Sequence, residues 1–144
     1  MKQRTGFVSN SSSSSFIIRI PKDVDTFEEF LSRVMFVHES EWHLLYPQHK
    51  TWRGYKYNLI RIYETIWEGV QNHMVPMHRA KMMAEEWGVA DEGSNVVPFF
   101  DEKHWNYAIV GYADEDGDWW GEVEHGSHWN MPCEIGTVIR ISEH

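Results

Sequence analysis

Cysteine is almost absent from this chain, because Cys133 is the only one among its 144 residues. A single thiol cannot form an internal disulfide, and this composition is typical of proteins in a reducing cytoplasm. Long apolar runs are also missing, so no segment approaches the length of a membrane-spanning helix. The basic residues near the start are followed by serines, where a signal peptide needs its apolar stretch. We therefore expect a cytoplasmic protein with no membrane partner.

Positive charge is scarce as well. The chain has 13 Lys and Arg residues against 22 Asp and Glu residues, for a net charge of −9. A surface with this excess of carboxylates repels a phosphate backbone, which disfavours nonspecific binding of nucleic acid. The same charge favours a basic partner. We expect another protein, and no nucleic acid, to be the partner.

Familiar signatures of catalysis and of cofactor binding are missing too. Residues 121–127 have the glycine spacing of a phosphate-binding loop, but no lysine precedes Ser127. The acidic run at 114–118 begins like a calcium loop, but its glycine and its closing glutamate are not at the required positions. Cys133 follows a proline in an apolar setting, and His128 is the histidine nearest to it in sequence. These absences favour a function that is not enzymatic.

Aromatic residues, by contrast, are abundant. They make up 15% of the chain and include eight tryptophans. Tryptophan buries a large area and favours interfaces, because its ring is apolar and its N–H donates a hydrogen bond. Neighbouring side chains on a strand point to opposite faces, so either Trp119 or Trp120 is expected to face outward. With Trp105 and Trp129 in adjoining loops, these residues predict a binding surface, and ordinary core packing is the alternative.

One short segment carries candidate metal ligands. His125 and His128 are three residues apart, and Cys133 follows five residues later. Zinc takes imidazole and thiolate ligands in tetrahedral geometry, and His104 or Glu124 is a candidate fourth ligand. The spacing matches no standard zinc finger or metalloprotease motif, so a polar loop without metal is the alternative interpretation.

Five consecutive serines, Ser11 to Ser15, stand between two apolar blocks near the start of the chain. Serine hydroxyls compete for backbone hydrogen bonds, so an ordered serine tract must be held by the fold or by a neighbouring chain. The segment Arg4–Phe16 resembles an N-terminal signature shared by many small uncharacterised proteins of bacteriophages and of phage-bearing bacteria. Residues 21–144 resemble no known family. The resemblance implies a phage or prophage origin and no particular activity.

The hydrophobic pattern predicts an α+β fold in a single domain spanning residues 1–144, with residues 1–13 as a candidate N-terminal arm. The apolar run at 16–18 indicates a central strand with both faces covered. Thr26 and Glu29 have the spacing of a helix capping box, and residues 39–55 have no clear period. We expect a mostly antiparallel sheet of about four strands packed against about three helices on one face. The strands are expected at 14–20, 106–114, 118–124 and 136–142, and the helices at about 26–38, 55–72 and 76–88.

Three functions are compatible with these features. The first is a non-enzymatic accessory protein of phage type that binds a host or phage protein. The second is a structural component of the virion, with the N-terminal arm docked on neighbouring subunits. The third is a zinc-binding protein or a zinc hydrolase that uses His125, His128 and Cys133.

Overall fold

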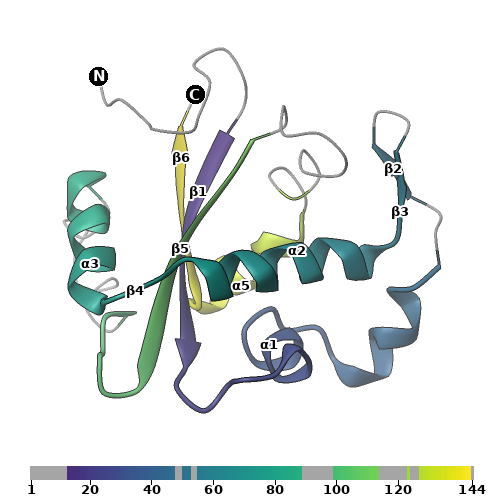
Figure 1. The fold of residues 1–144 in the computed structure, drawn as a ribbon, viewed down its shortest axis with the longest axis horizontal. Coiled ribbons are helices and arrows are strands. Elements are labelled where there is room, and N and C mark those ends of the chain that lie inside the picture. The colour runs from purple at the N-terminus through teal and green to yellow at the C-terminus, as the bar shows by residue number, and fades with distance from the viewer. Residues whose placement is uncertain are drawn as a thin grey trace.

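The structure is a computed structural model that describes residues 13–47, 50–52, 55–88, 99–113, 123 and 127–143. Its main feature is a four-stranded antiparallel sheet in the order β4-β5-β1-β6, with helices packed against it (Figure 1). The predicted α+β class is therefore confirmed. The elements are β1 (Ser13–Pro21), α1 (Phe27–Arg33), the 3-10 helix η1 (Glu39–Leu44), β2 (Lys50–Trp52), β3 (Tyr55–Tyr57), α2 (Leu59–Asn72), β4 (Met74–Val75), α3 (Met77–Glu86), β5 (Trp105–Ala113), the 3-10 helix η4 (Ser127–Trp129), α5 (Asn130–Ile135) and β6 (Val138–Glu143).

Strand β1 is central, as its apolar run predicts. It pairs with β5 from Ser13 to Pro21 and with β6 from Ser13 to Ile18. Its residues Phe16, Ile17 and Ile18 are all fully buried, although successive side chains point to opposite faces. Both faces of the sheet are therefore covered. The last three serines of the tract, including the buried Ser14 and Ser15, belong to this strand, so the fold itself holds them.

Helices cover both faces of the sheet. On one face, Phe16 and Ile18 pack in the main core with Ile62 and Ile66 of α2. On the other face, Ile17 packs with the fully buried Ala80 and Ala84 of α3. Figure 1 shows α3 on one side of the strands and α1, α2 and α5 on the other. The expectation that helices cover only one face was wrong, because β4 carries the chain across the sheet edge before α3 begins.

The helix ends follow local sequence signals in two cases. Thr26 caps α1, since its side-chain oxygen accepts a hydrogen bond from the backbone N–H of Glu29 at 3.2 Å. Pro76 is the N-cap of α3, and Gly88 follows the helix with a φ of +80°, which glycine adopts without strain. The predicted helix at 55–72 begins only at Leu59, because Tyr55–Tyr57 pairs with Lys50–Trp52 as a hairpin.

The C-terminal half agrees with the predicted pattern in part. Strands β5 and β6 lie where strands at 106–114 and 136–142 were expected, whereas the two-residue β4 and the short α5 were not anticipated. The strand expected at 118–124 lies outside the described residues except for Val123, which has helical backbone. The candidate arm at 1–13 also lies outside them, except for Ser13 at the start of β1. Among the helices of the described residues, none combines the length and the apolarity needed to cross a bilayer.

Candidate functional site

One residue of the predicted tryptophan surface, Trp129, lies in the core instead. Trp129 is fully buried, and its ring stacks on Phe16 with 3.8 Å between the ring centroids. Its indole N–H donates a hydrogen bond to the backbone carbonyl oxygen of Val123 at 2.6 Å. Trp129 was therefore wrongly expected on a binding surface, because η4 carries it over the central strand. Trp119 and Trp120 lie outside the described residues.

Trp105 is half-buried, and its ring makes a cation–π contact with Arg19. The guanidinium carbon of Arg19 lies 4.0 Å from the centroid of the Trp105 ring and 4.9 Å from that of Phe99. Arg19 also donates a hydrogen bond from Nη1 to the carbonyl oxygen of Phe99 at 3.3 Å. Burial lowers the pKa of Arg19, although the hydroxyl of Tyr107 and the carboxylate of Asp101 oppose this shift. Arg19 of β1 thus contacts both Trp105 of β5 and Phe99 of the preceding loop, and it attaches that loop to the sheet.

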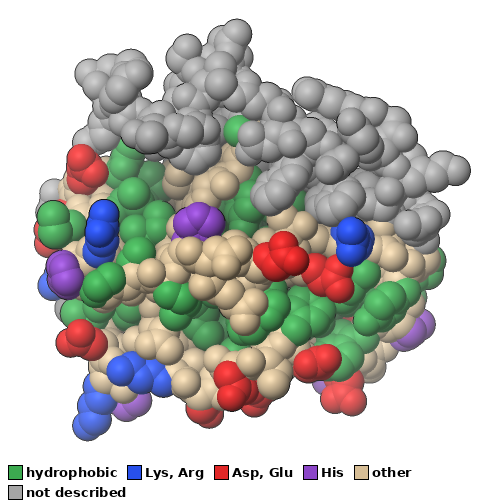
Figure 2. Space-filling model, viewed as in Figure 1, with side chains coloured by type: hydrophobic (Ala, Val, Ile, Leu, Met, Phe, Trp, Pro, Cys, Tyr) green, Lys and Arg blue, Asp and Glu red, His purple; other side chains and the backbone are tan. Residues whose placement is uncertain are grey.

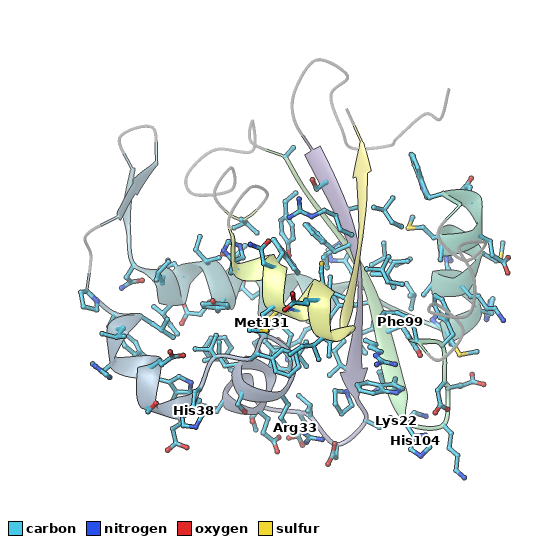
Figure 3. All side chains as sticks on the ribbon, turned by 180° about the vertical axis from the view of Figure 1, so that it is seen from behind. Lys22, Arg33, His38, Phe99, His104 and Met131 are labelled. Carbon is cyan, nitrogen blue, oxygen red and sulfur yellow. The ribbon has the colours of Figure 1, made fainter. Side chains whose placement is uncertain are left out.

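His104, a candidate fourth zinc ligand, belongs to the same loop. Its Nδ1 lies 2.7 Å from Oδ2 of Asp101, and its carbonyl oxygen accepts a hydrogen bond from the N–H of Lys22. Figure 3 shows His104 and Lys22 close together, at the end of the molecule where β1 ends. The hydrogen bond from His104 is the main cause that lowers the pKa of Asp101. The backbone N–H of Asp101 donates to the hydroxyl of Tyr107 at 2.7 Å, so His104 is part of a loop-closing network.

The candidate zinc ligands are only partly described. His125 lies outside the described residues, and His128 points Nε2 at the carbonyl oxygen of Val123, 3.2 Å away. The His128 ring also meets Tyr63 edge-on, with 6.0 Å between centroids, and burial lowers its pKa to about 4. Cys133 packs against the main core, where burial raises the pKa of its thiol despite the nearby Arg140. Within the part of the chain that the structure describes, no three His, Cys, Asp or Glu side chains gather as a metal site.

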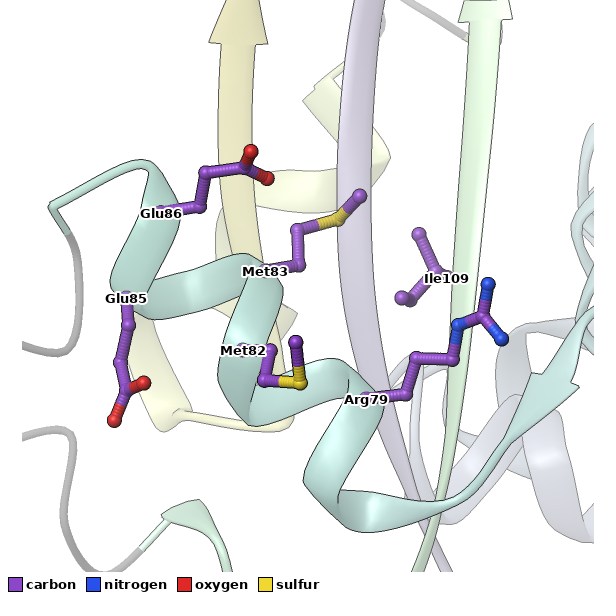
Figure 4. Close-up of a pocket in the computed structure, with 6 residues that line it drawn as sticks. All are labelled: Arg79, Met82, Met83, Glu85, Glu86 and Ile109. Carbon is purple, nitrogen blue, oxygen red and sulfur yellow. The ribbon is translucent and has the colours of Figure 1, made fainter.

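A different feature has the shape of a binding site. A groove of about 600 Å³ lies between α3 and β5, and Figure 4 shows its side chains. The described residues that line it are Arg79, Met82, Met83, Glu85, Glu86 and Ile109. In Figure 4, Arg79, Met83 and Glu86 extend from the helix toward Ile109 on the sheet. These three residues are four and three positions apart, so they form one stripe along α3.

Strand β5 forms the sheet wall of the groove. The odd-numbered positions of β5 face α3, since Tyr107 and Ile109 both pack in the core layer beneath that helix. On the helix, the alanines are fully buried against the sheet, whereas Met82 keeps 64% of its surface exposed. A flexible, apolar methionine therefore lies at the mouth of a groove with charged residues at its rim.

A smaller pocket of about 190 Å³ lies on the other side of β5, against α2. Its described lining includes Gly69, His73, Val110 and Tyr112. His73 has its Nδ1 2.9 Å from the carbonyl oxygen of Gly69, so this imidazole is attached to the last turn of the helix. The pocket is narrow and its helix wall is polar, so the larger groove is the better candidate for a protein ligand.

No family model, curated protein or solved structure matches this chain. The resemblance of Arg4–Phe16 to phage proteins thus stays a prediction.

The groove was not predicted, although the sequence of α3 contains a signal for it. Two adjacent methionines on a helix cannot both point to the core, because successive positions are about 100° apart. The Met82-Met83 pair was therefore a signal that one methionine remains at the surface.

Proposed function

We propose that this protein acts without catalysis, by binding a segment of another protein in the groove between α3 and β5. The observation that carries the proposal is the methionine-lined opening, where Met82 is exposed and Met83 faces Ile109 across the groove. Methionine has three rotatable bonds and a polarizable sulfur, so it adapts to varied apolar side chains. The groove volume falls in the range of about 300–1,000 Å³ that is usual for ligand pockets.

The charges suggest what the partner carries. Glu85 and Glu86 lie at the C-terminal end of α3, and Arg79 lies nearer its start. The whole chain has a net charge of −9, which attracts a basic partner over a longer range. Figure 2 shows acidic, basic and hydrophobic side chains together on the described part of the visible face. A partner segment with one or two large apolar side chains next to Lys or Arg fits this combination.

The resemblance at the N-terminus supports a phage or prophage setting for this activity. In that setting, the protein is an accessory factor that binds a host protein or another phage protein. A virion component would instead be present in purified particles. Mass spectrometry of such particles separates these two roles, since an intracellular accessory factor is absent from them.

The decisive experiment is a comparison of two methionine variants in a co-purification. Met82→Gln makes the opening of the groove polar without a large change in side-chain size. We expect it to weaken the binding of the partner by about 2 kcal/mol or more, as at an interface hot spot. Met131→Gln is the matched control, because Met131 is 49% exposed on α5, on the other side of the sheet from α3 (Figure 3). A partner that both variants retain equally would show that the groove is not the binding site.

A further inference from the structure

Strand β5 is paired along its whole length on one side only. On its inner side every residue of β5 pairs with a residue of β1. On its outer side the only strand among the described elements is β4, which pairs with Tyr107 and Ala108. The stretch of β5 beyond β4 begins at Ile109 and includes the exposed Gly111. Within the part of the chain that the structure describes, no strand pairs with this stretch on its outer side.

The backbone hydrogen-bonding groups of this stretch point outward. The N–H of Ile109 donates to the carbonyl oxygen of His73 at 3.2 Å, so Ile109 directs its backbone groups away from β1. In an antiparallel ladder, this direction alternates from one residue to the next along the strand. The N–H and C=O of Gly111 therefore point to the same outer side as those of Ile109. An added strand that lies there can exchange hydrogen bonds with Gly111 in both directions.

A recess lies on each side of this stretch. The groove between α3 and β5 is on the face of Ile109, whereas the pocket of about 190 Å³ against α2 is on the face of Val110 and Tyr112. Figure 1 shows α3 on one side of β5 and α2 on the other. Successive side chains of a strand point to opposite faces. A strand added along this edge would therefore direct one side chain toward the groove and the next toward the pocket.

The two recesses differ in chemistry. The groove offers the apolar side chains of Met82, Met83 and Ile109. The pocket against α2 is more polar, and the exposed Glu68 is the only carboxylate among the described residues that line it. Neither Lys nor Arg is among those residues, so a basic side chain of a ligand would meet the charge of Glu68 without competition there. The net charge of −9 favours the same kind of ligand.

We propose that the partner segment binds as an extended strand that pairs antiparallel with β5 at Ile109–Gly111. It places an apolar side chain in the groove and a Lys or Arg beside Glu68. This inference rests on the proposed function and adds the conformation and the sequence pattern of the partner. When a peptide joins a sheet edge, main-chain hydrogen bonds supply affinity and pockets for alternate side chains supply specificity. A helix in the groove would satisfy its own backbone groups and would leave those of Gly111 unused.

The probe for this proposal is a fluorescein-labelled peptide of about eight residues in which leucine and lysine alternate. It is titrated with the full-length protein, and binding is followed by fluorescence anisotropy. A residue directly opposite Gly111 shares its face and also directs its own N–H toward β5. In the proposed register these residues are the leucines, whereas the N–H groups of the lysines point away from the sheet.

N-methylation of the peptide separates these two sets of N–H groups without any change to the protein. N-methylation of the leucines removes the groups that pair with β5, and we expect it to weaken binding at least about tenfold. N-methylation of the lysines changes only the outer edge of the added strand and should stay within about threefold. The two modified peptides have the same side chains and charge, so each is the control for the other.

Protein variants locate the site on the molecule. Met82→Gln should weaken the unmodified peptide at least about tenfold, and Glu68→Gln about threefold, as for an exposed ion pair. The matched control Glu134→Gln removes an exposed carboxylate from α5, which packs against β6 at the opposite edge of the sheet. It should change the affinity by less than about 1.5-fold. Circular dichroism melting checks that each variant keeps the fold.

The possible failures of this proposal and of the proposed function differ in outcome. If Met82→Gln weakens the peptide but the two N-methylated peptides bind equally, strand addition is wrong and the groove remains the binding site. If N-methylation of the leucines weakens binding but Met82→Gln does not, the strand pairs elsewhere, as at β6, and both proposals are overturned. Absence of saturable binding up to about 1 mM would also overturn strand addition.

Discussion

The indole ring of Trp129 lies nearly parallel to the phenyl ring of Phe16, at an interplanar angle of 11°. This stack joins the turn before α5 to the central strand, and both residues are fully buried. The guanidinium of Arg140 lies on the same phenyl ring, 5.1 Å from its centroid. The segment that leads into the C-terminal helix α5 is therefore packed on the central strand through this aromatic stack.

Removal of this aromatic contact should strongly destabilise the protein. We expect Trp129→Ala to lower the free energy of unfolding by about 3–5 kcal/mol, through lost burial and the cavity left behind. Trp129→Phe keeps an aromatic ring but leaves the Val123 carbonyl without its indole donor, so about 1–3 kcal/mol is expected. Urea denaturation measures both. The exposed Met131→Ala is the control, and a loss of similar size there would contradict the special role of Trp129.

Gly69 should not tolerate a side chain. A Cβ at this position would lie 2.8 Å from the hydroxyl oxygen of Tyr112 and 3.4 Å from Cγ1 of Val110. We expect Gly69→Ala to destabilise by about 1–3 kcal/mol, although alanine is the better helix former. Thermal unfolding measures the change. When Tyr112→Phe is also present, Gly69→Ala should lower the free energy of unfolding by less. If the two changes in unfolding free energy were strictly additive, this clash would be ruled out.

His128 should make stability depend on pH. Burial lowers its pKa from 6.5 to about 4, so the folded protein keeps this imidazole neutral while the unfolded chain takes up a proton below pH 6.5. Below that value the unfolded state binds more protons, so stability falls as the pH drops from 6.5 toward 4, by up to about 3 kcal/mol. The neutral His128→Gln variant should lack this component. The measurement is the difference in unfolding free energy between variant and wild type across this pH range.

An exposed histidine provides the comparison for that experiment. His78→Gln changes an exposed residue of α3. If His128→Gln and wild type kept the same difference in unfolding free energy at every pH, the buried imidazole would not be the titrating group.

Zinc content is the fourth prediction. Nε2 of His128 faces a backbone carbonyl, which leaves only Nδ1 of this ring as a lone-pair donor to a metal. We expect untagged protein to hold less than about 0.1 zinc per chain by elemental analysis, since a site with three or four ligands retains the ion tightly. Stoichiometric zinc that disappears in Cys133→Ala would contradict this expectation and would support the zinc hypothesis instead.

Much of the fold was predictable because its signals are local. The buried run at 16–18 indicates a strand with two covered faces, and the Thr26 capping box, Pro76 and Gly88 mark helix ends through their own backbone preferences. Strand β4 and helix α5 are too short to show a period of their own. The hairpin of β2 and β3 was missed because pairing across a turn depends on the partner strand as well as on local preference.

The candidate site was less predictable for a related reason. The sequence alone determined the charge, the high tryptophan content and the central strand. Only the tertiary structure decided that Trp129 is a core residue, that α3 crosses to the second face and that Met82 stays exposed beside β5. Composition and period are properties of neighbouring residues, whereas burial and grooves depend on which distant surfaces meet. The packing of α3 against the sheet is one such tertiary contact. It places Met83 in the groove and leaves Met82 exposed at the groove opening.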